Sequence, residues 1–400
     1  MRAAVLGDGH GRHHDETAIG VGFVLHVMQV AGAEVLVAET IRRLGAKIRP
    51  VILCLDGIGA LGEQMQNEGY PVVVLGRRPG LDLTLPRRIA TVVDSFALDV
   101  LHAHQYTPFF YSALAKPFLR QPVHLMFTEH GRHFPDVVSS RRRLVNRYAL
   151  SRLADEVNGV SQFSVDSLAR VDGFDGRAME VIPNGIDLWR YRNGTRSEAK
   201  ARVGLDVTRR HVACVARFHP IKDHAMLLHA FKEVADRVAD VDLVLAGDGP
   251  LRAELTALVE ELGIVSRVHF LGVRGDVPDV LRAADIFALT SIAEAASITL
   301  LEAMASELPV VVTDVGGNPE IVDHGVHGLR VPRGDASGAA AALITLLADD
   351  ALAHRLGDAA RARVVERYQL DTTVQTYYER YAVGARKIAS RRGQPEALTA

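Results

Sequence analysis

The stretch Thr290–Gly317 reads TSIAEAASITLLEAMASELPVVVTDVGG and holds two glutamates, Glu294 and Glu302, with seven residues between them. An apolar run just before it predicts a strand, the good helix formers of Ile298–Ser306 predict a helix, and Pro309–Thr313 predicts a second buried strand. Strand, helix and strand in this order are typical of a parallel sheet, in which ligands bind beyond the carboxyl ends of the strands. The stretch therefore predicts a parallel α/β sheet with a binding site where the helix begins.

The start of this helix suits a phosphate or diphosphate, because the first N–H groups of a helix are free and its dipole is positive there. We expect the N–H groups of Ser297, Ile298 and Thr299 to face such an anion. At a rise of about 1.5 Å per residue, the side chains of Glu294 and Glu302 lie roughly 10 Å apart, so that one reaches a sugar and the other a ribose. On spacing alone, a surface helix with two solvated glutamates stays an open alternative.

The composition indicates a soluble protein of two domains, since 400 residues exceed what one hydrophobic core usually supports. The net charge of −2 gives no case for binding nucleic acid. Cys54 and Cys214 each lie in an apolar run, which indicates buried thiols in a reducing compartment rather than a disulfide or a metal site. No apolar run reaches the roughly 18 residues of a membrane span, and the N-terminus lacks the pattern of a secretory signal. We therefore expect a cytoplasmic protein.

Strand-like runs alternate with helical stretches in two successive series. The first series of predicted strands is Phe23–Met28, Pro50–Leu55, Pro71–Leu75, Val100–His104, Val123–Thr128 and Glu156–Val160. The second series is Val212–Ala216, Leu243–Ala246, Val268–Leu271, Ile286–Leu289, Val310–Thr313 and His327–Val331. Alternation of this kind predicts two doubly wound parallel sheets, each covered by helices on both faces.

The two series meet at IPNGIDLWRYRNGTR, a segment rich in proline, asparagine, glycine and charge that predicts a linker. The predicted organisation is a tail at 1–20, an N-terminal domain at 21–182, the linker at 183–196, a C-terminal domain at 197–365, a helix at 366–383 that packs back on the N-terminal domain, and a tail at 384–400. Two such domains leave a cleft between the carboxyl edges of their sheets, where a site is expected by default.

The motif VARFHPIK begins in a predicted strand and places Arg217 and Lys222 at the carboxyl end of that strand. Two cations beside the helix that starts at Ser297 suit a diphosphate, which they hold and then neutralise as it leaves. A solvated surface pair is the alternative for either cation alone.

Two glycine turns follow in the C-terminal half. In LAGDGP, Gly247 and Gly249 either let a ligand approach the backbone or form a bare tight turn, and the motif lacks the full dinucleotide fingerprint. In FLGVRGD, the turn at Val273 and Arg274 can meet a nucleobase through its backbone.

FTEHGRHFPD ends a predicted strand of the N-terminal domain with His130, Gly131 and Arg132. A lone histidine is more often structural, but one in a glycine turn at the carboxyl edge of a sheet faces the predicted cleft. We therefore favour a functional role for His130.

Two further patterns bear on metals, and neither predicts a metal site. His10, His13, His14 and Asp15 lie in a polar, glycine-rich segment that is typical of a mobile tail. Asp240-Val241-Asp242 matches the Asp-x-Asp pattern of metal-dependent sugar transferases, but it opens a strand at the end away from the cleft, which indicates a structural role.

The run Arg141–Arg152 contains five arginines beside Leu144, Val145 and Tyr148. Such a run either docks on anionic lipid headgroups or forms a solvated helix face.

Taken together, these residues resemble the retaining nucleotide-sugar glycosyltransferases of family 4, which have the GT-B fold of two Rossmann-like domains. The resemblance covers about Val24–Tyr381 and rests on motifs that are specific only as an ordered set. The set is VARF with a following lysine, LAGDGP, FLG, SIAEAASITLLEAMA and PVVVTDVGGNPEIVDHGVHGL, with VAGAE, TEHG and IPNGID in the N-terminal half.

The resemblance implies a role for each candidate residue. Arg217 and Lys222 would bind the donor diphosphate, and the amides of Ser297, Ile298 and Thr299 would cap phosphate and sugar. Glu302 would bind the ribose, Glu294 the hydroxyls of the donor sugar, and the backbone of Val273 and Arg274 the base. His130 would contact the transferred sugar, with Lys222 and Glu294 as its partners in catalysis, and Ala31 and Gly32 would approach donor and acceptor.

Two departures from the family pattern put the identity of the sugar in doubt. Ala31-Gly32 stands where the family usually has two glycines, and Ala295-Ala296-Ser297 replaces a segment that usually contains glycine. Neither change removes a charged group.

The function implied is transfer of a hexose from a nucleoside-diphosphate sugar, with UDP favoured, to a hydroxyl of a glycan, glycolipid or lipid-linked acceptor in polysaccharide synthesis. Retention of the anomeric configuration and independence of metal and cofactor are expected, at the inner face of the membrane if Arg141–Arg152 docks there. A sugar-nucleotide epimerase of the same architecture and a non-catalytic nucleotide-sugar-binding scaffold are the alternatives. A phosphorylase is disfavoured because no lysine for its cofactor can be placed.

Overall fold

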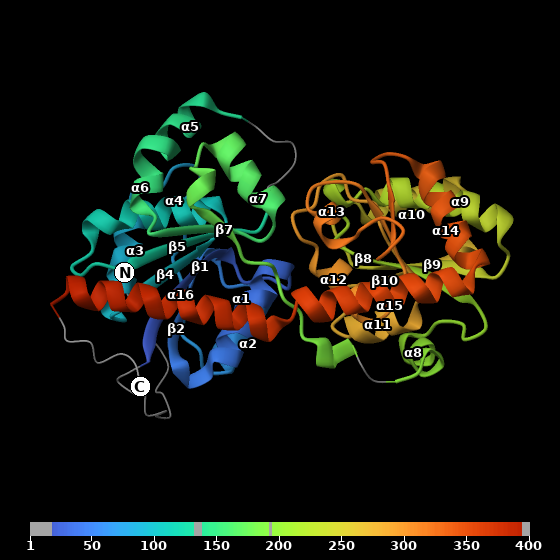
Figure 1. Ribbon diagram of the computed structural model, residues 1–400, viewed down its shortest axis with the longest axis horizontal. Helices are drawn as coiled ribbons and strands as arrows, with labels where there is room; N and C mark the ends of the chain where they lie inside the picture. The colour runs from blue at the N-terminus through green and yellow to red at the C-terminus, as the bar shows by residue number, and fades with distance from the viewer. Residues whose placement is uncertain (1–17, 132–137, 192–193, 394–400) are drawn as a thin grey trace.

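The computed structural model describes residues 18–131, 138–191 and 194–393, and it consists of two α/β domains placed side by side (Figure 1). The N-terminal sheet has the order β3-β2-β1-β4-β5-β6-β7, and every pair of neighbouring strands is parallel. Its strands are β1 (Ile19–Val27), β2 (Ile48–Gly57), β3 (Val72–Val74), β4 (Val100–His104), β5 (His124–Glu129), β6 (Glu156–Gly159) and β7 (Met179–Val181). The predicted series lacked β7, a three-residue edge strand.

The C-terminal sheet has the order β10-β9-β8-β11-β12-β13 and is also parallel throughout. Its strands are β8 (Arg210–Val215), β9 (Val241–Ala246), β10 (Val268–Gly272), β11 (Ile286–Leu289), β12 (Val310–Thr313) and β13 (Leu329–Val331). Each sheet reverses its winding direction once, between β1 and β4 and between β8 and β11. At such a switch point the loops diverge to opposite faces and leave room for a ligand at the carboxyl ends of the strands. The predicted fold class, two doubly wound parallel sheets, is confirmed.

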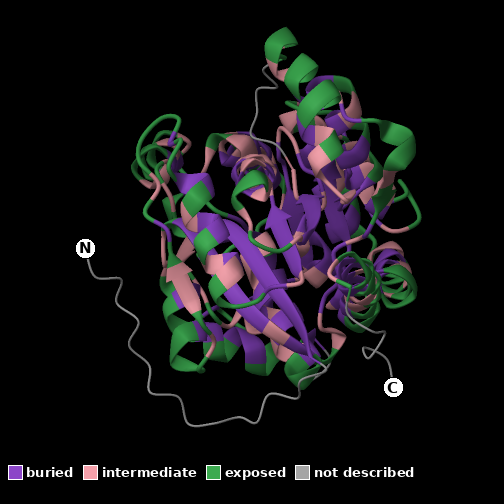
Figure 2. Cartoon of the chain, turned by 90° about the vertical axis from the view of Figure 1, so that its left-hand side faces the viewer, coloured by how far each residue is buried: buried purple, intermediate pink, exposed green. Residues whose placement is uncertain are grey.

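Helices cover both faces of the N-terminal sheet because its strands are apolar on both sides. Along β1, Val21, Phe23 and Leu25 pack against one set of helices, whereas Val24 packs against the other. The first set is α1 (Gly32–Leu44), α2 (Ala60–Asn67) and α16 (Leu370–Arg391). The second set is α3 (Leu85–Ser95) and α4 (Tyr106–Ala115). Figure 2 shows the buried strands between helices whose outer faces are exposed.

The remaining helices complete the two domains. In the N-terminal domain these are α5 (Ser140–Val145), α6 (Ser151–Leu153) and α7 (Gln162–Ser167). In the C-terminal domain they are α8 (Arg196–Val203), α9 (His224–Arg237), α10 (Arg252–Glu261), α11 (Val277–Ala283), α12 (Ile298–Ala305), α13 (Asn318–Ile321), α14 (Ala336–Ala348) and α15 (Asp350–Arg367). Among the described residues, only α14 and α15 taken together have the length and composition of a membrane span, across a bend of 104°; no single helix does.

The chain crosses between the domains twice, and the two crossings are hydrogen-bonded to each other. The N–H of Ile186 donates to the carbonyl of Tyr368 at 2.9 Å, and the N–H of Leu370 donates to the carbonyl of Ile186 at 3.0 Å. A Cβ on Gly185 would lie 2.6 Å from the Cα of Leu370, so only glycine allows this approach. On the two sides of the second crossing, α15 and α16 lie nearly end to end, one on each domain (Figure 1).

The predicted C-terminal tail at 384–400 is wrong for its first part, because α16 continues to Arg391. Ile388 and Ala389 are buried, and the guanidinium of Arg392 donates to Asp99 and to the carbonyls of Leu98 and Pro122. The local sequence does not report this, because Arg392 meets residues that precede β4 and β5, far away in the sequence. At the other end, β1 already begins at Ile19, inside the predicted tail at 1–20.

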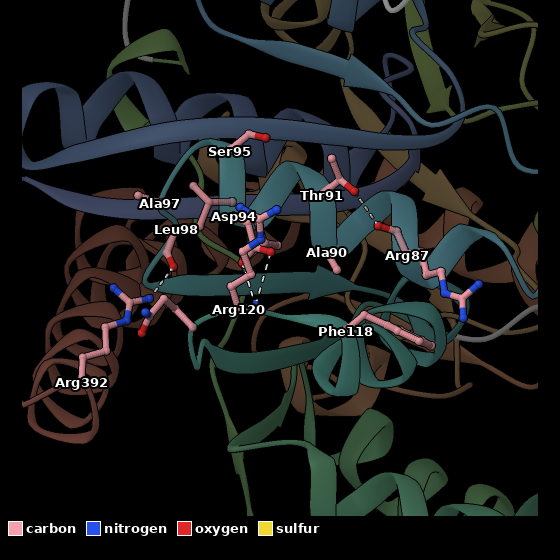
Figure 3. A pocket seen from close by; sticks show the side chains of 12 residues that line it. Arg87, Ala90, Thr91, Asp94, Ser95, Ala97, Leu98, Phe118, Arg120 and Arg392 are labelled. Atoms are coloured by element: carbon pink, nitrogen blue, oxygen red, sulfur yellow. Dashed lines mark hydrogen bonds between the residues drawn. The ribbon is translucent and has the colours of Figure 1, made fainter. Parts of the chain in front are cut away.

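A cavity of about 550 Å³ lies beside α3 and the end of α16. Ala97 and Leu98, which line it, directly precede β4, so the cavity is at the amino edge of the N-terminal sheet (Figure 3). The carboxyl edge, where a ligand is expected, is the opposite one.

Candidate active site

The candidate site begins at the β8–β11 switch point, where the loops after these two strands are bonded together. The N–H of Ile292 donates to the carbonyl of Ile221 at 2.8 Å, and the hydroxyl of Thr290 donates to the carbonyl of Asp223 at 2.9 Å. These bonds fix the loop that carries Lys222 beside the loop that carries Glu294. Residues that are far apart in the sequence are therefore held next to each other by backbone contacts.

Lys222 and Glu294 are in direct contact. The Lys222 ammonium donates to Oε1 of Glu294 at 2.5 Å, and the hydroxyl of Ser291 donates to the same oxygen at 2.6 Å. Glu294 is 9% exposed, so its charge depends on these two donors. Lys222 has further N–H donors that can reach a second anion.

The glycine pair Gly316-Gly317 packs against the backbone of Glu294 and Ala295. A Cβ on Gly316 would lie 1.8 Å from the carbonyl oxygen of Glu294, and one on Gly317 would lie 1.8 Å from that of Ala295. Gly316 also has a φ of 56°, and the N–H of Gly317 donates to the carbonyl of Glu294 at 2.9 Å. These two glycines at the end of Thr290–Gly317 therefore let the chain pack closely against the backbone of Glu294.

Helix α12 starts directly after this loop, with Ser297 as its N-cap. The Ser297 hydroxyl accepts from the N–H of Leu300 at 3.4 Å, as expected for a capping serine. The N–H groups of Ile298 and Thr299, at the first two helical positions, have no intrahelical acceptor and are left for an anion. The serine side chain thus closes the helix, while the amides that follow it face outward.

Glu302 lies one turn into α12 and is bonded to a residue that sequence reasoning missed. The hydroxyl of Tyr191, in the segment between the domains, donates to Oε1 of Glu302 at 2.6 Å. Burial raises the pKa of Glu302, and the hydrogen bond from Tyr191 acts in the opposite direction. An aromatic residue in a polar linker shows no periodicity, so only its position nine residues after Ile182 in the IPNGID motif could have drawn attention to it.

Arg217 is exposed just beyond β8, and its charge acts across the domain boundary on the carboxylate of Glu34 on α1. Burial raises the pKa of Glu34, whereas its own backbone N–H and the charge of Arg217 lower it. Glu34 follows Gly32 in the VAGAE loop and was not among the predicted site residues.

Two glycines of the N-terminal domain meet the C-terminal domain at this place. A Cβ on Gly32, which follows the N-cap residue Ala31 of α1, would lie 3.0 Å from Cγ1 of Ile298. Gly131, with a φ of 121°, has a Cβ position 2.8 Å from Cβ of Ala295. The loops after β1 and β5 thus touch the start of α12 and the loop of Glu294.

His130 precedes Gly131 and is half-buried beside another histidine. Its Nε2 lies 2.8 Å from Nδ1 of His104, the last residue of β4, and burial lowers the pKa of His130 to about 4. His130 is therefore neutral at physiological pH. Arg132, its predicted neighbour, lies outside the described residues.

The turns after β9 and β10 complete the edge of the site. Cβ atoms on Gly247 and Gly249 would lie 2.0 Å and 2.5 Å from the carbonyl oxygens of Ala216 and Phe218, so these glycines let the β9 turn pack against the chain's own backbone. A tight structural turn, one of the two alternatives for this motif, therefore explains both Gly247 and Gly249. Beside them, Val273 is 74% exposed.

The side chain of Arg274 is paired with Asp276 through Nε at 2.7 Å, which leaves the backbone of this turn as the part available to a base.

No group of three or more His, Cys, Asp or Glu side chains that could hold a metal ion is found in the described residues. The predicted structural role of Asp242 is confirmed, because Arg209, Arg267 and His269 all donate to its carboxylate. Burial alone raises the pKa of Asp242, but these donors lower it to about 2. The histidines of the N-terminal segment, His10, His13 and His14, lie outside the described residues. Cys54 and Cys214 are buried free thiols, as predicted.

The fold and the site together define a GT-B glycosyltransferase, and comparison with known proteins agrees. Residues 195–363 match the model of the glycosyl transferases group 1, and residues 30–190 match that of glycosyltransferase family 4. N-acetyl-alpha-D-glucosaminyl L-malate synthase of Bacillus anthracis is 31% identical over 302 residues, which cover 75% of this chain and 78% of that protein. The chain belongs to glycosyltransferase family 4.

Two further relatives are informative. D-inositol 3-phosphate glycosyltransferase of Mycobacterium sp. (strain KMS) is 35% identical over 202 residues, which cover 48% of this chain and 45% of that protein. The crystal structure of Anabaena HepE in complex with UDP-glucose superposes with a TM-score of 0.81 at 24% identity, over 91% of this chain and all of that one. The second likeness concerns the fold.

Proposed function

We propose that this glycosyltransferase moves a hexose from a nucleoside-diphosphate sugar, UDP-linked by preference, to a hydroxyl group with retention of configuration and without a metal. The observation that carries the proposal is the contact of Lys222 with Glu294 beside the start of α12. It joins a cation for the leaving diphosphate to a carboxylate for the sugar hydroxyls, at a helix start that favours anions.

Each group at the site has a part in this reaction. Arg217, Lys222 and the amides of Ile298 and Thr299 hold the diphosphate and stabilise its charge as the glycosidic bond breaks. Glu302, oriented by Tyr191, accepts hydrogen bonds from the ribose hydroxyls.

Glu294 accepts hydrogen bonds from the sugar, His130 contacts the same sugar from the other domain, and the exposed turn at Val273–Arg274 meets the base. Closure of the Gly32 and Gly131 loops on α12 excludes water, which limits hydrolysis of the donor.

Retention is proposed to follow a same-face route, in which the departing phosphate takes the proton of the acceptor hydroxyl. Lys222 is the group best placed to stabilise the charge on that phosphate, since its ammonium already lies at the sugar-side carboxylate. The preference for UDP is supported by the fold-level likeness to HepE, whose structure holds UDP-glucose.

The acceptor is proposed to be a lipid-linked saccharide at the cytoplasmic face of a membrane, in synthesis of a polysaccharide or glycoconjugate. Support comes from a surface that we call the arginine face. Its exposed residues are Arg141, Arg143, Leu144, Val145, Arg147, Tyr148 and Arg152.

The helical segment that carries the arginine face projects at the outer end of the N-terminal domain (Figure 1). Leu144, Val145 and Tyr148 are 61%, 48% and 55% exposed between the arginines, and exposed apolar side chains among cations suit an anionic bilayer. Arg142 does not belong to this face, because it is paired with the buried Asp172 at 2.7 Å and lies 3.7 Å over the ring of Tyr106.

The test is release of nucleoside diphosphate from UDP-, GDP- and ADP-sugars, with and without EDTA and with a panel of acceptors. The panel includes lipid-linked saccharides as well as L-malate and inositol 3-phosphate, for which two relatives are named. Acceptor-dependent release of one nucleotide, unaffected by EDTA, with a product of unchanged anomeric configuration by NMR, is expected.

The Lys222→Ala enzyme should lose about 100- to 1,000-fold in kcat, the usual effect of removing one group that stabilises developing charge. The matched control is Lys232→Ala, which changes a half-exposed lysine of α9 that is paired with Asp236. Conversion of the donor to its epimer without acceptor, binding without any release, or normal turnover of Lys222→Ala would each overturn the proposal.

A further inference from the structure

Three histidines lie close together on β4 and directly after its neighbour β5, next to the β1–β4 switch point. His102 and His104 are on β4, with ring centroids 4.0 Å apart, and His130 directly follows β5. His102 is satisfied on both sides, by the Tyr381 hydroxyl at Nδ1 and the Thr128 hydroxyl at Nε2, each at 2.7 Å. His104 and His130 share a single hydrogen bond, 2.8 Å between Nδ1 of His104 and Nε2 of His130.

This bond couples the protonation of the two rings. A neutral imidazole carries one N–H, so the ring that donates has a bare nitrogen on its other side, and the ring that accepts carries its hydrogen there. In the described part of the chain, Nε2 of His104 and Nδ1 of His130 are buried without a hydrogen-bond partner. One of these two nitrogens must therefore hold a hydrogen that has no acceptor in the protein.

The surroundings decide which nitrogen that is. His104 is 3% exposed and packs between the rings of Phe23 and His102, where a donor without an acceptor is costly. His130 is less buried, and its neighbour Gly131 touches Ala295 at the domain boundary, where a ligand can supply an acceptor. Buried N–H groups without an acceptor are rarer in proteins than buried acceptors without a donor. The hydrogen is accordingly placed on His130.

We propose that His104 is a positioning residue: its Nδ1–H donates to Nε2 of His130, so that His130 presents Nδ1–H as a hydrogen-bond donor to the transferred sugar. The inference rests on the proposed function, which identifies the ligand as the sugar of a nucleoside-diphosphate sugar. It excludes a general-base role for His130, because the nitrogen that faces the ligand already carries its hydrogen.

The groups next to this pair are a third histidine, two hydroxyls and a carboxylate. His102 on β4 lies beside His104 and is itself hydrogen-bonded to the hydroxyls of Thr128 on β5 and Tyr381 on α16, and the carboxylate of Glu129 accepts from the N–H of Gly131 at 3.0 Å. Burial lowers the pKa of His104 as it does that of His130.

The first experiment determines which ring nitrogen of His130 carries the hydrogen, and it does not depend on enzyme activity. Two-dimensional ¹⁵N–¹H correlation spectra of histidine-labelled protein distinguish the Nδ1–H from the Nε2–H form of His130, assigned with a His130→Gln variant. The Nδ1–H form is expected. The Nε2–H form would overturn the proposal even if the enzyme is an active glycosyltransferase.

The second experiment compares two variants of equal size. His104→Asn places an amide donor near the position of Nδ1, whereas His104→Asp places an acceptor there and draws the hydrogen of His130 to Nε2. We expect His104→Asn to stay within about threefold of the parent kcat and His104→Asp to lose about 10- to 100-fold, the worth of one hydrogen bond in a charged or buried setting. His229→Asn, on an exposed position of α9, is the control.

The outcomes separate the inference from the function on which it rests. Loss in both His104 variants with the Nε2–H form in the spectra, or no loss in either, would overturn the role of His104. If neither the parent nor any variant transfers sugar, but the spectra show Nδ1–H on His130, the proposed function fails and the arrangement of the histidines stands. Should His104→Asp not fold, the spectra and His104→Asn still decide.

Discussion

The hydroxyl of Tyr191 lies 2.6 Å from Oε1 of Glu302 and joins the segment between the domains to the helix that begins at the site. Glu302 is largely buried, and among the described residues the hydroxyl of Tyr191 donates to its carboxylate. Orientation of this carboxylate, and with it the proposed recognition of the ribose, therefore depends on the linker.

Tyr191→Phe removes this donor and keeps the ring. We expect KM for the donor nucleotide to rise about 10- to 100-fold, as for loss of a hydrogen bond to a charged group, with a smaller change in kcat. Steady-state kinetics with the identified donor measure both constants. Tyr148→Phe, on the exposed arginine face, should leave them unchanged, and equal constants for Tyr191→Phe would show that the linker does not orient Glu302.

Gly316 offers a test of how the glutamate loop is supported. Gly316→Ala should destabilise the protein by several kcal/mol or displace Glu294, because its Cβ would lie 1.8 Å from the Glu294 carbonyl oxygen and its φ is 56°.

Gly325→Ala is the control, since Gly325 has a φ of 77° and no heavy atom within 4 Å of its Cβ position. The Gly325→Ala variant should lose only the stability that a positive φ costs an alanine, about 1 kcal/mol. Thermal unfolding and donor binding of the two variants separate the contributions, and equal effects would show that the contact with Glu294 is unimportant.

Stability should fall on acidification below about pH 6.5. Burial lowers the pKa of six of the described histidines, which are His102, His104, His130, His211, His224 and His327. Below the ordinary histidine pKa the unfolded chain binds more protons than the folded one, so the free energy of unfolding decreases as pH falls from about 6.5 toward 4. Each such histidine contributes up to about 1.4 kcal/mol per pH unit in that window.

The measurement is urea unfolding at several pH values between neutral and acidic. His224→Gln should flatten the dependence, whereas His229→Gln, at an exposed position of the same helix, should not. A free energy of unfolding that stays constant from pH 7 to pH 5 would contradict the neutral state of these rings.

The arginine face predicts binding to anionic vesicles. The protein should sediment with vesicles of phosphatidylcholine and phosphatidylglycerol but not with phosphatidylcholine alone, and added salt should weaken the binding. Arg143→Glu with Arg147→Glu should abolish it. The same reversal at Arg237 and Arg355, exposed on the other domain, is the control. Binding that survives the first pair would place the membrane contact elsewhere.

Much of the fold was predictable because its strands are dense apolar runs. The strands at Val100–His104, Ile286–Leu289 and Val310–Thr313 were predicted with the bounds that the structure has. Strand β7 was missed because its three residues are half-exposed or exposed and read like a loop. The end of α16 was missed because its last turns are stabilised by packing against the N-terminal domain, which the local sequence does not show.

For the candidate site, too, some residues could be predicted from the local sequence and others could not. Lys222, Glu294 and Glu302 were found from charge placed at predicted strand and helix ends, which local sequence reports. Tyr191 and Ser291 act through contacts with residues from other segments, and no local pattern distinguishes them from an ordinary linker tyrosine or loop serine. Gly247 and Gly249 show the reverse, since their conformational freedom serves the chain's own packing.

Helix α16 has a consequence for the order in which the molecule is made. Leu370, Val374, Tyr377, Tyr381 and Ala385 belong to the core that covers one face of the N-terminal sheet. Those residues leave the ribosome after the whole C-terminal domain, so the domain that is synthesised first is finished last. Until then its sheet exposes an apolar face that includes Phe23 and Met126. Apolar surface that stays exposed in this way makes an incomplete chain prone to aggregation.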